Sequence, residues 1–123
     1  MAVSRIIDHI ASVGTTIGTG STDLGTYSPP NSVVGGLLLF AAGKSNAATP
    51  LVCRRMISAT YTKSNAGVLA LRDINVIQQT TDLALLTTNV TLVAVSGAVV
   101  VRATGGLLGT DLEWGFDLFI SIT

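Results

Sequence analysis

Residues 110–123 have the sequence TDLEWGFDLFISIT, and this stretch decides the class of fold. Apolar side chains occupy every second position from Leu112 to Ile122, with mostly polar or small residues between them. Successive side chains of a β-strand point to opposite faces, so this period of two predicts a strand with one apolar and one mostly polar face.

A second strand is predicted just before it. Residues 98–104, AVVVRAT, are rich in valine, and the glycine-rich residues 105–109 mark a turn. We expect the two strands to form an antiparallel hairpin in which Arg102 lies opposite or diagonal to Asp111 and Glu113. Cross-strand ion pairs of this kind contribute about 0.2–1 kcal/mol each.

Further strands are predicted upstream. Apolar and β-branched runs occupy residues 33–42, 51–62, 68–77 and 83–95, with turn-forming residues between them. No long 3.6-residue periodicity is present in this region. We therefore predict that residues 33–123 form an all-β domain, an antiparallel β-sandwich or a jelly-roll-like barrel.

Residues 1–32 have a different character. Val3, Ile6, Ile7 and Ile10 fall at helical spacing after Ser4, a possible N-cap, which predicts a short helix up to about residue 12. A strand or an extended arm is the alternative. Residues 14–32 are dense in Gly, Thr, Ser and Pro, which indicates a linker or arm. An apolar patch on such an arm would suit docking on a neighbouring subunit.

The composition points to an assembly. Of the 123 residues, 11% are charged and 48% are hydrophobic, and the mean hydropathy is +0.61. Ordinary soluble domains carry about 25% charged residues, so we expect other copies of the chain to cover part of the surface. Aggregation-prone insolubility is the rival interpretation.

Other classes of protein are disfavoured. Seven basic and seven acidic residues leave no net charge to attract nucleic acid or an anionic membrane. The apolar runs are far shorter than the roughly 20 residues of a membrane-spanning helix, and no signal-peptide pattern is evident. With Cys53 as its one cysteine, the chain is expected to be made in a reducing cytoplasm.

The sequence offers no catalytic motif. His9 is the one histidine, so a Ser-His-Asp or Cys-His arrangement would require it. Cys53 is followed by two arginines, yet a lone cysteine in a strand is more often a small buried hydrophobe. Gly18-Thr19-Gly20 lacks the remaining residues of a phosphate-binding loop. We expect neither enzymatic activity nor a cofactor.

Asp111, Glu113 and Asp117 share one face of the last predicted strand. Carboxylates are ligands for Ca²⁺, which makes the three a weak candidate for a calcium site shared with a neighbouring subunit. The alternative is an exposed face whose carboxylates pair with Arg102, or with Arg54, Arg55 or Arg72. We expect the ion pairs rather than a metal site.

Candidates for subunit contact are apolar or aromatic residues outside the predicted core. Phe119 interrupts the polar face of the last strand, and Tyr27 lies in the predicted arm. The full set of candidates is Ile6, Ile7, Ile10, Tyr27 and Phe119.

The C-terminal region resembles a known family. Residues 99–105 have the sequence VVVRATG, residues 109–115 have GTDLEWG, and Leu118-Phe119-Ile120 follow. This resembles a C-terminal pattern of small virion proteins of tailed bacteriophages. The resemblance is confined to residues 99–120 and consists of common strand and turn residues around one tryptophan.

The resemblance implies a β-sandwich subunit of a bacteriophage virion, in the tail or fibre apparatus or decorating the capsid. Its partners would be copies of itself in a symmetric homo-oligomer, for which we expect a trimer, and other virion proteins contacted through the N-terminal arm. No nucleic acid or membrane insertion is expected. The alternative function is that of a receptor- or glycan-binding β-sandwich module, against which the scarcity of aromatic residues counts.

Overall fold

The computed structural model describes residues 5–46, 48–82, 88–106 and 109–122, which form strands and loops with no helix. Within these ranges, therefore, no helix of membrane-crossing length is found. The eight strands are β1 (Arg5–Thr16), β2 (Ser21–Tyr27), β3 (Val33–Ser45), β4 (Val52–Lys63), β5 (Leu69–Thr81), β6 (Asn89–Val95), β7 (Ala98–Thr104) and β8 (Leu112–Ile122).

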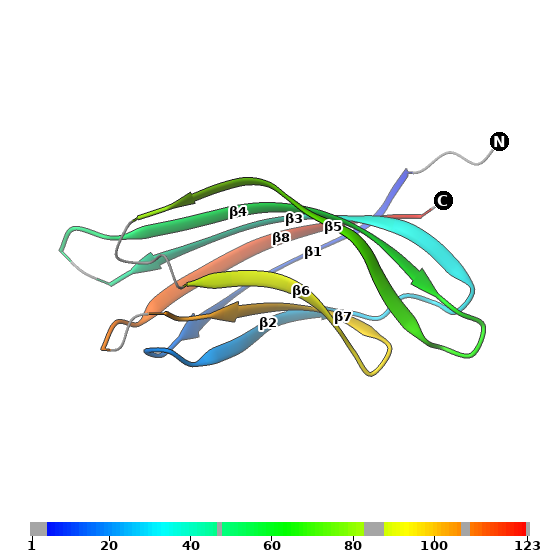
Figure 1. Cartoon of the computed structure of the whole chain (residues 1–123), viewed down its shortest axis with the longest axis horizontal. Coiled ribbons are helices and arrows are strands. Elements are labelled where there is room, and N and C mark those ends of the chain that lie inside the picture. Colours follow the sequence, from blue (N-terminus) through cyan, green and yellow to red (C-terminus); the bar gives the residue numbers. More distant parts are fainter. Residues whose placement is uncertain (1–4, 47, 83–87, 107–108, 123) are drawn as a thin grey trace.

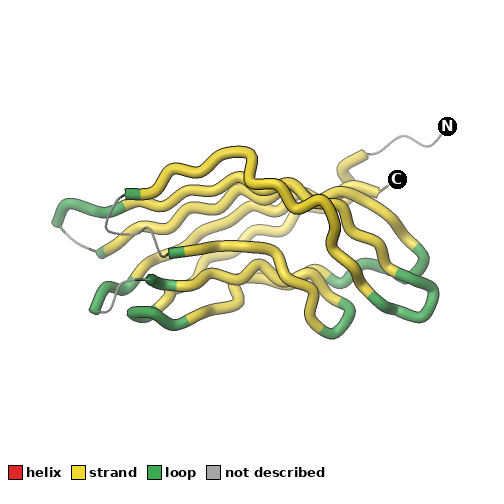
Figure 2. The backbone as a smooth tube through the Cα atoms, in the orientation of Figure 1, coloured by secondary structure: helices red, strands yellow, loops and turns green. Residues whose placement is uncertain are grey.

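The strands form two antiparallel sheets that pack against each other (Figures 1 and 2). One sheet has the order β1-β8-β3-β4-β5, and the other has the order β2-β7-β6. Apolar side chains from both sheets form one core. The prediction of an antiparallel all-β domain is thus confirmed, and two packed sheets are the arrangement of a β-sandwich.

β8 shows the predicted alternation of inward-facing apolar side chains with outward-facing, mostly polar ones. Leu112, Trp114, Phe116, Leu118 and Ile120 point inward and are buried. The indole Nε1 of Trp114 donates a hydrogen bond to the buried Thr16 hydroxyl at 3.0 Å. Gly43 pairs with Trp114 on the neighbouring strand, and a Cβ atom there would lie 2.7 Å from the indole ring. The glycine therefore makes room for the largest side chain of the core.

The predicted C-terminal hairpin is wrong. β7 pairs with β2 and β6, whereas β8 pairs with β1 and β3, so the chain crosses from one sheet to the other between them. β7 is the middle strand of its sheet, and both of its edges are already occupied. Arg102 accordingly pairs with Asp23 on β2, with Nε 2.7 Å from Oδ1, and not with Asp111 or Glu113.

The predicted N-terminal helix is also wrong. Residues from Arg5 to Thr16 form β1, which pairs with β8 along its length, so pairing within the sheet overrides the helical spacing of the isoleucines. The segment interpreted as a linker contains β2, which pairs with β7. Residues 5–27 are therefore parts of the two sheets and not a detached arm.

Candidate interaction surfaces

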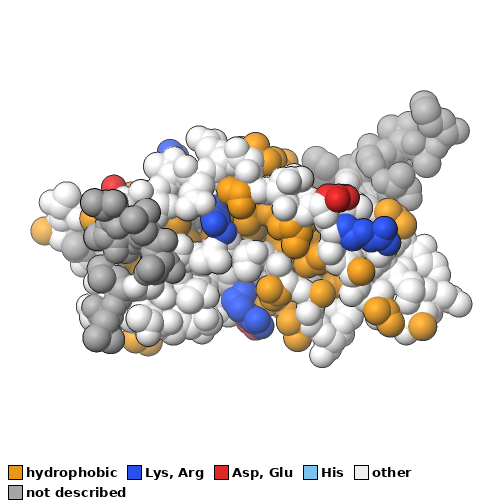
Figure 3. All heavy atoms as spheres, in the orientation of Figure 1, with side chains coloured by type: hydrophobic (Ala, Val, Ile, Leu, Met, Phe, Trp, Pro, Cys, Tyr) orange, Lys and Arg blue, Asp and Glu red, His pale blue; other side chains and the backbone are white. Residues whose placement is uncertain are grey.

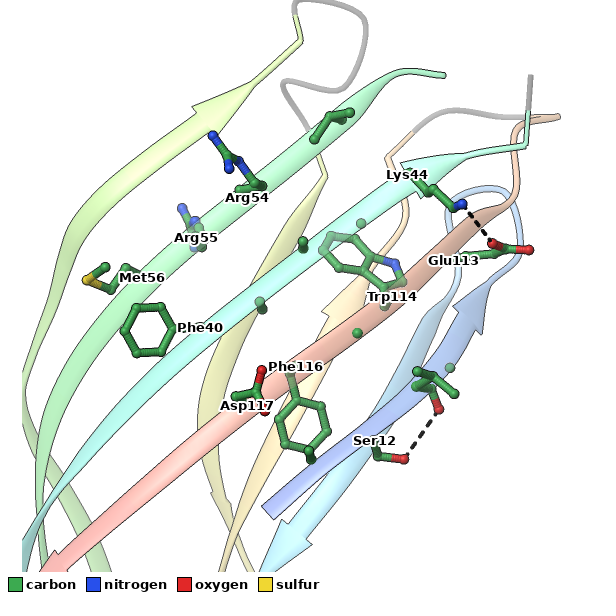
Figure 4. A pocket seen from close by; sticks show the side chains of 18 of the residues that line it. Ser12, Phe40, Lys44, Arg54, Arg55, Met56, Glu113, Trp114, Phe116 and Asp117 are labelled. Atoms are coloured by element: carbon green, nitrogen blue, oxygen red, sulfur yellow. Dashed lines mark hydrogen bonds and ion pairs between the residues drawn. The ribbon is translucent and has the colours of Figure 1, made fainter. Parts of the chain in front are cut away.

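The outer face of the five-stranded sheet holds an open concavity of about 1290 Å³ (Figure 4). The register explains its shape. Val13, Gly115, Ala42 and Arg54 lie side by side across β1, β8, β3 and β4. Because Gly115 and Ala42 are small, the surface is lowest in the middle of this row, and beyond the exposed Arg54 the row continues to Thr80 on β5.

Bulkier rows stand on both sides of this low row. One contains Asp117, Phe40 and Met56, and the other contains Glu113 and Lys44. The ammonium of Lys44 lies 3.8 Å from the Glu113 carboxylate. The result is a shallow groove that crosses the strands, with an apolar floor and charged groups along its rims (Figure 4).

Phe119 lies on this same face, next to the groove. The His9 ring stacks on it with centroids 4.6 Å apart, and the Phe40 ring meets it edge-on at 5.9 Å. His9 Nε2 lies 2.8 Å from Asp117 Oδ1. His9 is thus part of β1 rather than of an arm, and Phe119 is a half-buried member of an aromatic cluster at the surface. Its role in subunit contact stays a prediction.

Tyr27 and Ile10 are half-buried and pack against the core. The Tyr27 ring meets the Tyr61 ring edge-on, with centroids 6.5 Å apart. Burial raises the pKa of Tyr27 and raises that of Tyr61 to about 12, and the Tyr61 hydroxyl donates to the Ser121 carbonyl at 3.2 Å. The side chains of the other two contact candidates, Ile6 and Ile7, lie outside the described residues.

The three carboxylates of the calcium candidate have separate neighbours. Glu113 lies next to Lys44 and Asp117 next to His9, while Asp111 accepts a hydrogen bond from the Gly18 amide at 3.3 Å. Across residues 5–46, 48–82, 88–106 and 109–122, no three His, Cys, Asp or Glu side chains are close enough to hold a metal ion. Glu113 thus pairs with the ammonium of Lys44, and not with the arginines that we expected as its partners.

Arg102 and Asp23 form a two-point pair on the outer face of the three-stranded sheet, at 2.7 and 3.4 Å. The hydrogen bonds from the Arg102 guanidinium lower the pKa of the Asp23 carboxyl.

Cys53 is fully buried, and its Sγ lies 3.6 Å from the Thr81 hydroxyl. A buried thiol of this kind is a packing residue.

Sequence reasoning missed Phe40, Val13 and the exposed apolar residues of β5. Phe40 belongs to a continuous apolar run, which does not reveal the side of the sheet on which it lies. On β5 a signal was present, because Val76 and Ile77 are adjacent and cannot both point to the same face of a regular strand. Both are about half exposed.

Comparison with known proteins finds no matching family model and no matching curated protein. Two solved structures are similar to this chain. The tailspike protein of Acinetobacter baumannii phage AM24 has a TM-score of 0.46 and 9% identity, over 91% of this chain and 26% of that one. The tailspike protein of Acinetobacter phage vB_ApiP_P1 has a TM-score of 0.42 and 17% identity, over 96% of this chain and 21% of that one.

The chain thus spans about a quarter of the length of these two tailspike proteins. Both TM-scores are below 0.5, and both identities are below 25%. Neither neighbour therefore tells what this chain binds or does.

Proposed function

We propose that this chain is a non-catalytic structural subunit of a bacteriophage virion and that it works as a homo-oligomer. The observation that carries the proposal is the exposure of large apolar side chains in a chain with only 11% charged residues. They are Val13, Ile17, Val34, Phe40, Val68, Ile74, Val76, Ile77 and Val95.

Burying such residues between copies is favourable. Covering one Val, Ile, Leu or Phe side chain completely stabilises by roughly 1.5–3 kcal/mol. Obligate interfaces commonly bury over roughly 2,000 Å² and resemble a domain core cut in half. Six of the nine residues lie on the larger sheet and Val95 lies on the smaller one, while Ile17 and Val68 lie in the loops next to β1 and β5. Exposed apolar groups spread in this way are enough for contacts with more than one neighbour.

Assignment to a phage particle is supported by the sequence pattern of β7 and β8, which resembles that of small tailed-phage virion proteins. A place in the tail, in a fibre or on the capsid is compatible with it. Docking on another virion protein would use the face around Phe119, because residues 5–27 are built into the sheets. The proposal is non-catalytic because Cys53 is buried and, within the described residues, the His9 ring is hydrogen-bonded to Asp117 and to no hydroxyl or thiol that it could activate.

The virion assignment is tested on particles. Antibodies against the purified chain should label intact particles banded on a density gradient from cells that produce the protein, and the chain should sediment with those particles. Particles from cells in which the gene is deleted are the control. A chain that stays in the particle-free fraction would contradict the assignment.

The groove on the outer face favours a second candidate function, binding of a receptor or glycan. Phe40 offers an aromatic edge there, and Arg54 offers a cation with no carboxylate within ion-pairing distance among the described residues. In that case Phe40→Ala and Arg54→Ala would each abolish saturable binding to host cells, while Val34→Ala would not. Equal binding by all three variants would contradict this function.

A further inference from the structure

The two lateral sides of the molecule are built differently. On the side of β1 and β2, the sheets are closely joined. The Thr22 hydroxyl donates to the Thr15 carbonyl at 2.8 Å, and Leu24 packs beneath Gly14. This side nevertheless presents apolar side chains to solvent, because Val13 is 80% exposed and Ile17 is 74% exposed.

The side of β5 and β6 is more open. Val76 pairs with the buried Ile57 and points toward the inner face, yet it is 48% exposed because the smaller sheet ends at β6. Ile74, Ile77 and Val95 are exposed on the same side. Figure 3 shows hydrophobic side chains gathered between β5 and β6.

Charge is also distributed unequally between the two sides. β1, β2, β7, β8 and the loop before β8 carry five carboxylates and two arginines, namely Asp8, Asp23, Asp111, Glu113 and Asp117 against Arg5 and Arg102. Lys44 on β3 pairs with Glu113 and Arg102 pairs with Asp23, which leaves three carboxylates against Arg5. β4, β5 and the residue after β5 carry four cations and two carboxylates, namely Arg54, Arg55, Lys63 and Arg72 against Asp73 and Asp82.

The cations of the second group are not neutralised locally. Within the described part of the chain, Lys44–Glu113 and Arg102–Asp23 are the ion pairs that involve a Lys or Arg, and neither uses a cation of β4 or β5. The β1 side is thus apolar with an excess of negative charge, and the β5 side is apolar with an excess of positive charge.

We propose that copies of this chain assemble head to tail, with the β1 side of one copy docked on the β5 side of the next. The head-to-tail arrangement rests on the proposed homo-oligomer and specifies the interface between its copies. A contact between two β1 sides would bring carboxylates together, and a contact between two β5 sides would bring cations together, whereas the head-to-tail contact joins opposite charges. It places Val13 and Ile17 against Ile74 and Ile77.

The strand edges agree with this arrangement. The pairing of β4 with β5 shifts register at two places, and Asp73, which lies within the second shift, adopts a φ of 51°. Such bulges interrupt the hydrogen-bonding edge of a strand. They disfavour a symmetric extension of the sheet from β5 to β5 of a second copy. A head-to-tail contact uses two different surfaces, so it forms a closed ring when the rotation between neighbouring copies closes and an open filament when it does not. We expect the closed ring.

The test uses two blocked variants, each of which carries one charged substitution on only one of the two sides. Val13→Arg places a cation in the proposed contact against the cations of the β5 side, and Ile77→Asp places a carboxylate there against the carboxylates of the β1 side. Both residues are more than half exposed in the single chain, so the fold should tolerate the changes. Val34→Asp is the matched control, because Val34 is exposed on the central strand β3. Circular dichroism confirms the fold of each variant.

The masses are measured by multi-angle light scattering. We expect the native protein and Val34→Asp to be oligomers and each blocked variant alone to be a monomer. An equimolar mixture of the two blocked variants should form a dimer and nothing larger, because only one intact pair of surfaces remains. A mixture that stays monomeric, or blocked variants that stay oligomeric, would overturn the head-to-tail interface. A native protein that is itself a monomer would instead refute the proposed homo-oligomer.

Discussion

Removal of residues 1–30 is expected to unfold the protein. The deletion takes away β1 and β2, which are an edge strand of each sheet, together with the core residue Leu24 and the Thr16 hydroxyl that accepts the Trp114 hydrogen bond. A domain of this size has a total stability of only about 5–15 kcal/mol. The loss of two of the eight strands exceeds that margin.

The truncated chain should show no cooperative thermal transition and no near-ultraviolet circular dichroism signal from Trp114. The matched control is deletion of residues 1–4, which leaves all eight strands in place and should melt like the full chain. If residues 1–32 were a dispensable docking arm, the longer deletion would instead fold normally. A native-like melt of the chain from residue 31 onward would contradict the integration of β1 and β2 into the sheets.

Trp114→Ala should cause the largest loss of stability among single substitutions in the core. The indole is 2% exposed and covers Gly43, so its removal leaves a cavity. Substitutions of Phe or Trp by Ala in cores cost about 3–5 kcal/mol. The buried Thr16 hydroxyl also loses its partner, and an unsatisfied buried polar group costs roughly 1–3 kcal/mol.

Urea denaturation followed by far-ultraviolet circular dichroism, at fixed protein concentration, measures this loss. Trp114→Phe is the control, since it keeps most of the ring over Gly43 and removes only the indole N–H, and it should be clearly more stable than the alanine variant. A loss below about 0.5 kcal/mol in Trp114→Ala would fall in the range of ordinary surface substitutions. It would contradict the position of Trp114 in the core.

The strands from β3 to β8 were predictable because their evidence is local. In β8 the inward side chains from Leu112 to Ile120 recur at every second position, and this period is independent of what the strand pairs with. The turn after β4 was predictable for a similar reason, because Lys63-Ser64-Asn65-Ala66-Gly67 contains several turn-forming residues. Gly67 has a φ of 86°, which glycine adopts without strain.

The pairing of the strands was not predictable from the same evidence. Residues 105–111 can form a hairpin turn or cross between two sheets, and the alternation in the flanking strands is the same in both cases. Which occurs depends on whether the edges of β7 and β8 are already occupied. Among the occupants are β2 and β1, whose residues are paired with partners 72–83 and 96–117 residues away in sequence. Contacts of such separation leave no mark in a local pattern.

The N-terminal residues show how weak local preference is in a short segment. Ile6, Ile7 and Ile10 satisfy a helical spacing, but β8 presents a long edge on which residues 5–16 gain backbone hydrogen bonds. Helix preferences differ by less than about 1 kcal/mol per residue, so pairing decides the outcome.

The interaction surfaces could be predicted only in part. Phe119 breaks the polar face of β8, whereas the charge asymmetry depends on which strands are neighbours.

The most direct test of the proposed homo-oligomer is the absolute mass of the native protein, measured by light scattering on a sizing column over a dilution series. A single species of fixed mass, larger than the 12.6 kDa chain at every concentration, is the predicted result. A trimer would match the expected number of copies. Another closed ring would support the proposed homo-oligomer with a different number of copies. A clean monomer at every concentration would contradict it, because the exposed apolar side chains would then need no second copy to cover them.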